Sequence, residues 1–188
     1  MGEGLVHDAS GKEMPALEAM KTAGIEPIEL EAKEGLALIN GTDGMLGMLI
    51  MACADLAALC TVADITAAMS IEGLLGTDRV FAPDLHGPLR PHVGQVASAA
   101  NIYALLNDSG IVASHLENDS RVQDAYSLRC APQVNGAVRD TIDYAATIAG
   151  RELQSFIDNP VILPDGRIES NGNFHGAPVA YVLDFLAI

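Results

Sequence analysis

The longest apolar stretch of the chain covers residues 44–76 and dominates its hydrophobic pattern. Three acids, Asp55, Asp64 and Glu72, interrupt this stretch. Asp55 and Asp64 fall on opposite faces of a helix, so no clean solvent-facing stripe is visible. A membrane helix needs about 20 apolar residues with few charges, and the acids argue against one. The pattern therefore predicts a core helix, about 50 Å long if unbroken, within an elongated bundle.

A second long helix is predicted after Pro132, where apolar residues keep helical spacing for about six turns. We expect Asp158-Asn159-Pro160 to stop it, because the residue before a proline avoids helical geometry. The positions that share the predicted apolar face are Val134, Val138, Thr141 or Ile142, Ala145, Ile148 or Ala149, Leu153 and Phe156.

Shorter helices are predicted where a proline opens an apolar pattern. One runs from Pro15 to Ala23 and ends at Gly24, and another begins at Pro178. A third runs from about Pro91 to Leu106, and its expected apolar face consists of Val93, Val96, Ala100 and Tyr103.

The remaining segments read as turns and loops. Residues 161–163 and 167–169 flank Pro164-Asp165-Gly166 and predict a small β-hairpin, while residues 111–120 predict a polar loop. The fold class is therefore all-α: an elongated, mostly antiparallel helical bundle with one small β-hairpin. We expect a single domain, with an N-terminal loop and short-helix region over residues 1–32 and a helical core over residues 33–188.

Composition and charge narrow the class of protein. The 188 residues are 49% hydrophobic and 19% charged, which is typical of a globular chain. The formal net charge of -15 opposes binding to phosphate backbones and anionic membranes. We therefore expect neither a nucleic-acid nor a membrane partner.

The residues that commonly bind metals do not form a site. Cys53, Cys60 and Cys130 lack metal-ligand spacing, and His86 and His92 have no third ligand at suitable spacing. Free thiols and the lack of a signal-peptide pattern at the N-terminus favour a cytoplasmic protein.

One polar triple stands out from this background. Gln123, Tyr126 and Arg129 are spaced three residues apart, so in a helix they would share roughly one face. A guanidinium fork binds a carboxylate, and an amide and a phenol can fix the rest of a zwitterionic ligand. On spacing alone, a surface segment with an exposed Arg and a buried Tyr is the favoured interpretation.

The segment around this triple resembles a known enzyme family. Residues 122–137, VQDAYSLRCAPQVNGA, resemble the VQDxYSLRCxPQVxGA segment of the histidine ammonia-lyases. KEGLALINGT at residues 33–42, DNP at 158–160 and NGNFHGAPVA at 171–180 also resemble that family, in its order and at about its spacing. Relatives that act on phenylalanine and tyrosine differ around the equivalent Gln and Arg, so histidine is the favoured substrate.

The resemblance implies a fold, a reaction and a set of roles. The fold is that of the aspartase and ammonia-lyase bundle, and the reaction releases ammonia from L-histidine to give trans-urocanate, a step of histidine catabolism. A methylidene-imidazolone prosthetic group supplies the electrophile. Arg129 is expected to bind the substrate carboxylate, Asn40 and Gln123 to hydrogen-bond around the prosthetic group and substrate, Tyr126 to place or assist the proton transfer, and Phe174 to line the site.

Asn40 and His175 each have a structural alternative to a role in the site. Asn40-Gly41 marks a tight turn, where Asn tolerates left-handed backbone dihedrals and Thr42 or Asp43 caps the next helix. His175 either contributes to the site or simply hydrogen-bonds a neighbouring backbone group.

The prosthetic group forms from an Ala-Ser-Gly tripeptide in this family, and Ala9-Ser10-Gly11 is interpreted as a decoy. The family's tripeptide precedes the INGT motif by roughly fifty residues and has different neighbours. Ala9-Ser10-Gly11 is expected to be an ordinary turn in a surface loop.

The chain thus resembles the middle of a longer enzyme, and a last helix that reaches Ile188 without a cap agrees with that interpretation. The family's sites are assembled from several subunits of a homo-tetramer. We expect the chain to be inactive alone, for want of the electrophile. The alternatives are a non-catalytic helical oligomerisation module, or pseudoenzyme, and an aromatic amino acid aminomutase of the same family.

Overall fold

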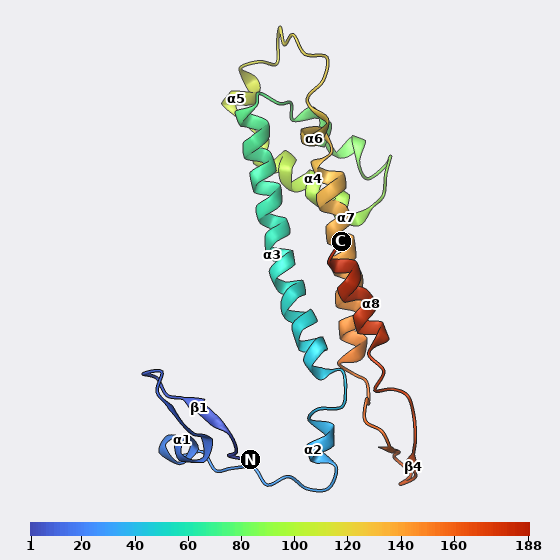
Figure 1. Cartoon of the computed structure of the whole chain (residues 1–188). Coiled ribbons are helices and arrows are strands. Elements are labelled where there is room, and N and C mark those ends of the chain that lie inside the picture. Colours follow the sequence, from blue (N-terminus) through green and yellow to red (C-terminus); the bar gives the residue numbers. More distant parts are fainter.

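The computed structural model describes residues 1–188 and shows an elongated bundle above a small N-terminal unit (Figure 1). Helix α3 (Asp43–Gly73) runs the length of the bundle, and α7 (Ala131–Glu152) returns antiparallel to it. Helix α8 (Ala177–Leu186) turns back along α7, and α4 (Val93–Leu106) crosses α7 near the upper end. The predicted all-α, elongated, antiparallel architecture is confirmed.

Helix α3 connects two separate cores. With its 31 residues it spans about 46 Å, close to the predicted length. The lower core joins α3, α7 and α8 and consists of Leu46, Leu49, Ala145, Ala149, Val179 and Val182. The upper core joins α3 to α4 and the connecting loops and consists of Ala68, Ile71, Phe81, Ile102, Leu106 and Val112.

Between the two cores, Asp64 of α3 is buried in a polar network. Its carboxylate accepts hydrogen bonds from Ser98 at 2.5 Å, Asn101 at 2.8 Å, Asn135 at 3.0 Å and Arg139 at 2.6 Å. Burial alone would raise the pKa of the Asp64 carboxyl, but these hydrogen bonds together lower the pKa below its ordinary value. The network ties α3 to both α4 and α7.

The face of α4 that packs on the bundle differs from the predicted one. Val93 is exposed, and the buried positions are Gly94, Gln95, Ser98, Ala99, Ile102 and Leu106. The polar members are buried because they have partners: Ser98 bonds Asp64, and Gln95 donates to Nδ1 of the buried His86 at 3.0 Å. Hydrophobic spacing alone missed this face because two of its six buried residues, Gln95 and Ser98, are polar.

Helix α7 ends earlier than predicted. Its last residue is Glu152, and not a residue next to Asp158-Asn159-Pro160. The apolar residues beyond the end do not enter the core, since Leu153 is exposed and Phe156 is 80% exposed. Ala149 is the last α7 residue in the lower core, which Val179 and Val182 of α8 complete.

The structure contains two small hairpins rather than one. The predicted hairpin is present as β3 (Val161–Ile162) paired with β4 (Ile168–Glu169). A second pairs β1 (Leu5–His7) with β2 (Glu13–Pro15), and α1 (Ala16–Ala23) packs on it. Gly24 ends α1 in the left-handed conformation, as its sequence predicted. The first hairpin was missed because its second strand, Glu13-Met14-Pro15, has one apolar residue between an acid and a proline and so lacks the apolar pattern of a strand.

Short helices interrupt the connecting loops. They are α2 (Glu34–Ala37), the 3₁₀ helices η1 (Arg79–Phe81) and η2 (Pro83–Leu85), α5 (Gly110–Ala113) and α6 (Tyr126–Arg129). Helix α5 lies in the segment predicted to be a loop. The Ser109 hydroxyl accepts a hydrogen bond from the Val112 amide at 3.2 Å and caps this single turn.

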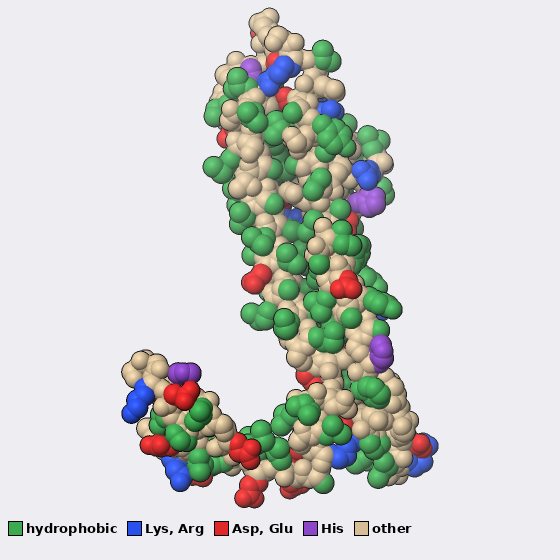
Figure 2. Space-filling view, viewed as in Figure 1, with side chains coloured by type: hydrophobic (Ala, Val, Ile, Leu, Met, Phe, Trp, Pro, Cys, Tyr) green, Lys and Arg blue, Asp and Glu red, His purple; other side chains and the backbone are tan.

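Exposed apolar side chains cover much of the surface of the long helical bundle (Figure 2). On α3 these include Met48, Met51, Leu59, Val62, Ile65 and Met69. By length and composition, α3 is also long and apolar enough to cross a membrane. However, the ion-paired Asp64 lies in its middle and Asp55 lies on its exposed side, which favours contact with other protein helices over lipid.

Candidate functional site

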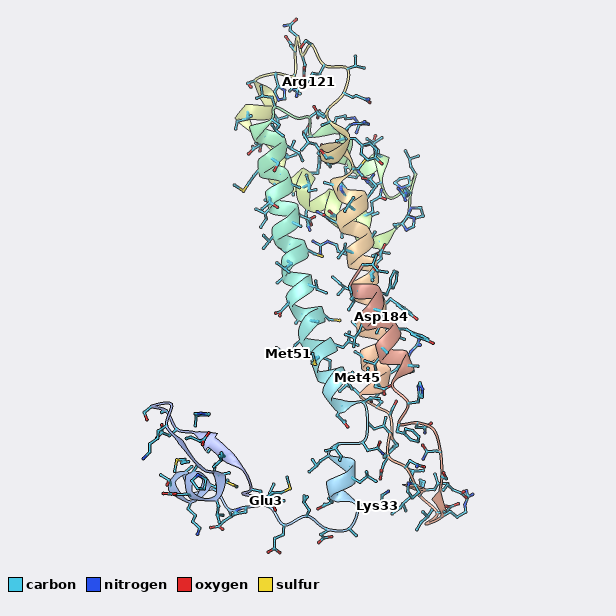
Figure 3. All side chains as sticks on the ribbon, in the orientation of Figure 1. Glu3, Lys33, Met45, Met51, Arg121 and Asp184 are labelled. Atoms are coloured by element: carbon cyan, nitrogen blue, oxygen red, sulfur yellow. The ribbon has the colours of Figure 1, made fainter.

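The residues predicted to form one site lie at opposite ends of the bundle. Asn40 precedes α3 and Phe174 precedes α8. Both lie at the lower end of the bundle in Figure 1, which we call the foot. Gln123, Tyr126 and Arg129 lie at the top, around α6. In Figure 3, the labelled Lys33 and Arg121 mark these two ends. Because the part of α3 before Ala63, about 30 Å of helix, lies between them, one copy of the chain cannot bring both groups to one small ligand.

The upper group does not share a helical face. Helix α6 covers only Tyr126–Arg129, so Gln123 lies outside it, and the spacing argument for a common face is wrong. Tyr126 is 76% exposed beside a groove lined by α3 and α7 side chains, whereas Gln123 lines a separate polar hollow near Asp119. Arg129 is partly buried, and its Nε donates to the Asp124 carbonyl oxygen at 2.9 Å. The two terminal nitrogens of the Arg129 guanidinium form no hydrogen bond or ion pair within the chain.

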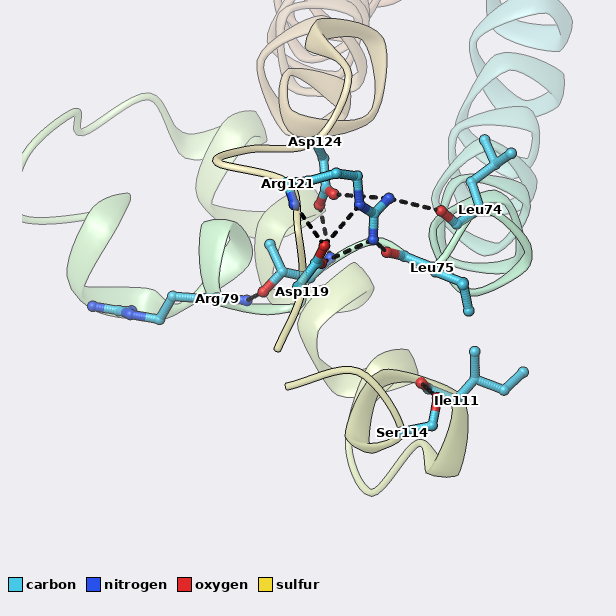
Figure 4. A network of polar contacts seen from close by, with 9 residues as sticks. Leu74, Leu75, Arg79, Ile111, Ser114, Asp119, Arg121 and Asp124 are labelled. Carbon is cyan, nitrogen blue, oxygen red and sulfur yellow. Dashed lines mark hydrogen bonds and ion pairs between the residues drawn. The ribbon is translucent and has the colours of Figure 1, made fainter. Parts of the chain in front are cut away.

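Arg121 fixes this segment on the end of α3, and sequence reasoning missed it (Figure 4). Its guanidinium donates to the carbonyl oxygens of Leu74, at 3.0 Å, and Leu75, at the C-terminal end of the helix. It also pairs with Asp119 at 3.0 Å, and the hydrogen bond from Arg121 lowers the pKa of the Asp119 carboxyl. A cation suits the partial negative charge of a helix C-terminus, but Arg121 lies 47 residues after Leu74 in the chain, so no local sequence signal marks this contact.

Asp124 completes the attachment of the upper segment. Its side chain is buried, and Oδ2 accepts a hydrogen bond from the Thr77 amide at 2.7 Å. Arg121 lies 3.6 Å from the other carboxylate oxygen. Arg121 and Asp124 are thus both bound to the chain around the end of α3, while Gln123, which lies between them in the sequence, stays exposed.

At the foot, motifs far apart in the sequence come together. Lys33 Nζ lies 2.7 Å from Asp158 Oδ2 and 2.6 Å from the Pro160 carbonyl oxygen. This contact lowers the pKa of the Asp158 carboxyl. Asn159 Oδ1 accepts from the Asn171 amide at 2.9 Å. The segments 33–42, 158–160 and 171–176 therefore form one junction below the lower core.

Asn40 lies in this junction on the turn that leads into α3. It is partly buried, and its φ is not positive, unlike that of Lys33. The left-handed conformation that would have explained an Asn structurally is therefore absent. Phe174 lies on the turn before α8 and is 38% exposed. Both side chains remain available to a ligand at the surface of the foot.

His175 has a structural partner next to it in sequence. Its Nδ1 accepts a hydrogen bond from the Ala177 amide at 3.2 Å, in the first turn of α8. Its ring also lines a polar hollow together with Glu152 and Asn173. The structural alternative for His175 is thus sufficient to explain its position.

Ser10 does not provide the environment of a prosthetic group. Ala9-Ser10-Gly11 forms the turn between β1 and β2, and the Ser10 hydroxyl donates to Asp8 Oδ1 at 2.6 Å. The hydrogen bond from Ser10 lowers the pKa of the Asp8 carboxyl. All three residues of the turn are exposed, so nothing encloses a reactive group there.

No group of three or more His, Cys, Asp or Glu side chains could hold a metal ion, and the three cysteines are free.

Comparisons with known proteins identify the class. The family described as aromatic amino acid lyase matches residues 1–188. The histidine ammonia-lyase of Streptomyces griseus is 65% identical over 188 residues, which are 100% of this chain and 36% of the relative. The tyrosine aminomutase from Streptomyces globisporus superimposes with a TM-score of 0.87 at 38% identity, covering 98% of this chain and 38% of that one.

A histidine ammonia-lyase from Trypanosoma cruzi superimposes with a TM-score of 0.83 at 40% identity, covering 99% of this chain and 34% of that one. The chain therefore belongs to the aromatic amino acid lyase family. It spans about a third of the length of the curated relatives that it matches. Enzymes of this family use a methylidene-imidazolone prosthetic group.

Proposed function

We propose that this chain is part of a histidine ammonia-lyase that converts L-histidine to trans-urocanate and ammonia. The observation that carries the proposal is the 65% identity to the Streptomyces griseus histidine ammonia-lyase along the whole chain. The similarity to tyrosine aminomutase is lower, at 38% identity, and supports the fold equally for either reaction. Such an enzyme would act in histidine catabolism in the cytoplasm.

The residues of the upper group would bind and orient the substrate. Arg129 would hold the carboxylate, because a guanidinium can donate two parallel hydrogen bonds to it. Its Nε bond to the Asp124 carbonyl oxygen restrains the side chain and leaves both terminal nitrogens free of that bond. Tyr126, exposed at the start of α6, would place or assist the transfer of the β-proton.

The amides of Asn40 and Gln123 would hydrogen-bond around the prosthetic group and substrate, and Phe174 would line the site. When bound, a methylidene-imidazolone supplies the electrophile that makes the amine a leaving group. Ala9-Ser10-Gly11 is not a suitable source for it, since Ser10 is engaged by Asp8 in an exposed turn. Within residues 1–188 the chain offers groups that bind and orient, but not the electrophile.

The separation of the two groups supports a site built from several copies of the chain. Asn40 and Phe174 at the foot of one copy would meet Gln123, Tyr126 and Arg129 at the top of another. Antiparallel packing of the apolar faces of α3 would bring these ends together, and it would cover side chains such as Met48, which is 73% exposed. A homo-tetramer, with several such contacts, fits this arrangement.

The proposal is tested with a full-length enzyme that contains this segment. Purified enzyme is incubated separately with L-histidine, L-tyrosine and L-phenylalanine, and the products are separated by chromatography. We expect urocanate and ammonia from histidine, and little product from the other two. A β-amino acid as the main product would favour the aminomutase instead. Absence of any product from all three substrates would favour a non-catalytic module.

A further inference from the structure

Thr42 makes an unusual contact for a residue at the start of a helix. It occupies the N-cap position of α3, where a Thr hydroxyl commonly accepts a hydrogen bond from the helix's own amides. Here the side chain forms no such bond. The hydroxyl instead donates to Oε1 of Glu152 at 2.6 Å, and Thr42 is only 1% exposed. The contact joins positions 110 residues apart in the chain.

The carboxylate of Glu152 does not stabilise its own helix. It is the last residue of α7, where the partial negative charge of the helix end disfavours a carboxylate. The hydrogen bond from Thr42 gives the carboxylate a partner at this unfavourable position. Charge-assisted hydrogen bonds of this kind are short and strong, so the pair can hold the start of α3 against the end of α7.

Two further close contacts pack against the turn that contains Thr42. A β-carbon at Gly41 would lie 2.8 Å from Ile157 Cδ1, in the segment that follows α7. A β-carbon at Gly176 would lie 2.7 Å from Met45 Sδ and 3.6 Å from Thr42 Cγ2. The turn before α3 is therefore packed against both the end of α7 and the turn before α8. These two turns carry Asn40 and Phe174.

We propose that Glu152 is a positioning residue, which fixes the Asn40 turn through its hydrogen bond with Thr42. This inference rests on the proposed role of Asn40 in the reaction. Glu152 touches neither the substrate nor the prosthetic group in this scheme. It acts by keeping the Asn40 amide at the place where it is needed, because a displacement of about 1 Å can lower a rate about 100-fold.

The test uses three variants of the full-length enzyme. Thr42→Val keeps the shape of the side chain and removes the donor, whereas Thr42→Ser keeps the donor. Thr147→Val is the matched control, because Thr147 lies on the exposed side of α7 and bonds only within its own helix, to the Asp143 carbonyl oxygen at 2.9 Å. For each variant, kcat and KM for histidine are measured together with the thermal unfolding temperature.

We expect Thr42→Val to lower kcat by about 10- to 100-fold. KM should change little, because Arg129, the proposed carboxylate ligand, would come from another copy of the chain and is held by the Asp124 carbonyl oxygen, not by the Thr42 turn. Thr42→Ser should restore most of kcat, and Thr147→Val should behave as the parent. An unchanged kcat in Thr42→Val, or an equal loss in Thr42→Ser, would overturn the proposal.

Hydrogen exchange separates this proposal from the proposed function. In Thr42→Val, the amides of residues 38–48 should exchange faster while those of residues 93–106 are unchanged, because only the turn is released. No change over residues 38–48 shows that the pair does not hold the turn. A parent enzyme that makes no urocanate overturns the proposed function and the catalytic role of Glu152, and the exchange data still decide whether Glu152 fixes the turn.

Discussion

Gly94 of α4 lies directly against Gly136 of α7, so closely that neither position has room for a β-carbon. A β-carbon at Gly94 would meet the Gly136 carbonyl oxygen, and one at Gly136 would meet the backbone of Gln95. The Gly94 amide also donates to Asp140 Oδ1 at 2.7 Å. The two helices thus cross in backbone contact, which places Gln95 and Ser98 within reach of their buried partners.

Gly136→Ala should therefore destabilise the chain. The added methyl group has to push the helices apart at their crossing, which costs about 1–3 kcal/mol of unfolding free energy. Gly150→Ala is the matched control on the same helix, since nothing lies within 4 Å of a β-carbon there. It should stabilise the helix, by up to about 1 kcal/mol. Urea unfolding followed by circular dichroism compares the two, and equal effects would contradict the backbone contact.

Asp64→Asn should be more damaging than any surface acid substitution. The change leaves Arg139, which lies 2.6 Å from the carboxylate, as a partly buried and unpaired charge. Loss of one member of a buried ion pair costs about 3–5 kcal/mol. Asp55→Asn, on the exposed side of the same helix, should change stability by no more than about 0.5 kcal/mol. Similar unfolding midpoints for the two variants would rule out a structural role for the network.

Acid should weaken the fold through the same carboxylate. The pKa of Asp64 is lowered from the ordinary value of 3.8, so its contribution to stability is present above that value. The contribution is lost as the pH falls through the lower pKa of the folded state. Unfolding midpoints should therefore decrease below about pH 4. In Asp64→Asn the decrease should be smaller, and an identical pH profile would show that other carboxylates account for it.

Arg129→Lys should impair substrate binding in the full-length enzyme. Lysine keeps the charge but cannot form the two-pronged contact with a carboxylate. We expect kcat/KM for histidine to fall by the equivalent of about 1.5–3 kcal/mol, the usual range for a hydrogen bond to a charged group. Arg90→Lys provides a comparison at an exposed arginine near α4. Equal kcat/KM values for the parent and Arg129→Lys would remove Arg129 from the site.

The isolated chain should fold and associate without turning over histidine. Its two cores provide the driving force for folding, and the apolar side chains left exposed on α3 provide the driving force for association. Light scattering should give a mass above that of one chain, which is 19.6 kDa. Urocanate production by the purified chain, absent from an Arg129→Ala version, would contradict the need for an external electrophile.

The helices could be predicted from the sequence because each has a strong local signal. The apolar run of α3, the proline at the start of α8 and Gly24 after α1 fixed three helices to within a few residues. The buried face of α4 could not be predicted in this way. It is selected by long-range polar partners, Asp64 and His86, which periodicity does not reveal.

The candidate site was predicted less completely than the fold. Sequence motifs proposed Asn40, Phe174 and Arg129 as site residues, but they gave no sign that Arg129 lies at the other end of α3 from the first two. Spacing suggested a shared helical face for Gln123 and Tyr126, yet α6 begins only at Tyr126 and so excludes Gln123. Thr42–Glu152 is a pairing between distant positions, and only the folded chain shows it.

The length of α3 also has a genetic consequence. If each site takes its foot from one copy and its top from another, a copy damaged at Asn40 and a copy damaged at Arg129 are defective in different halves. Mixed together in one oligomer, the two contribute one intact foot and one intact top, which can meet at the same site. Two inactive alleles could then complement each other, whereas two alleles damaged at the same end could not.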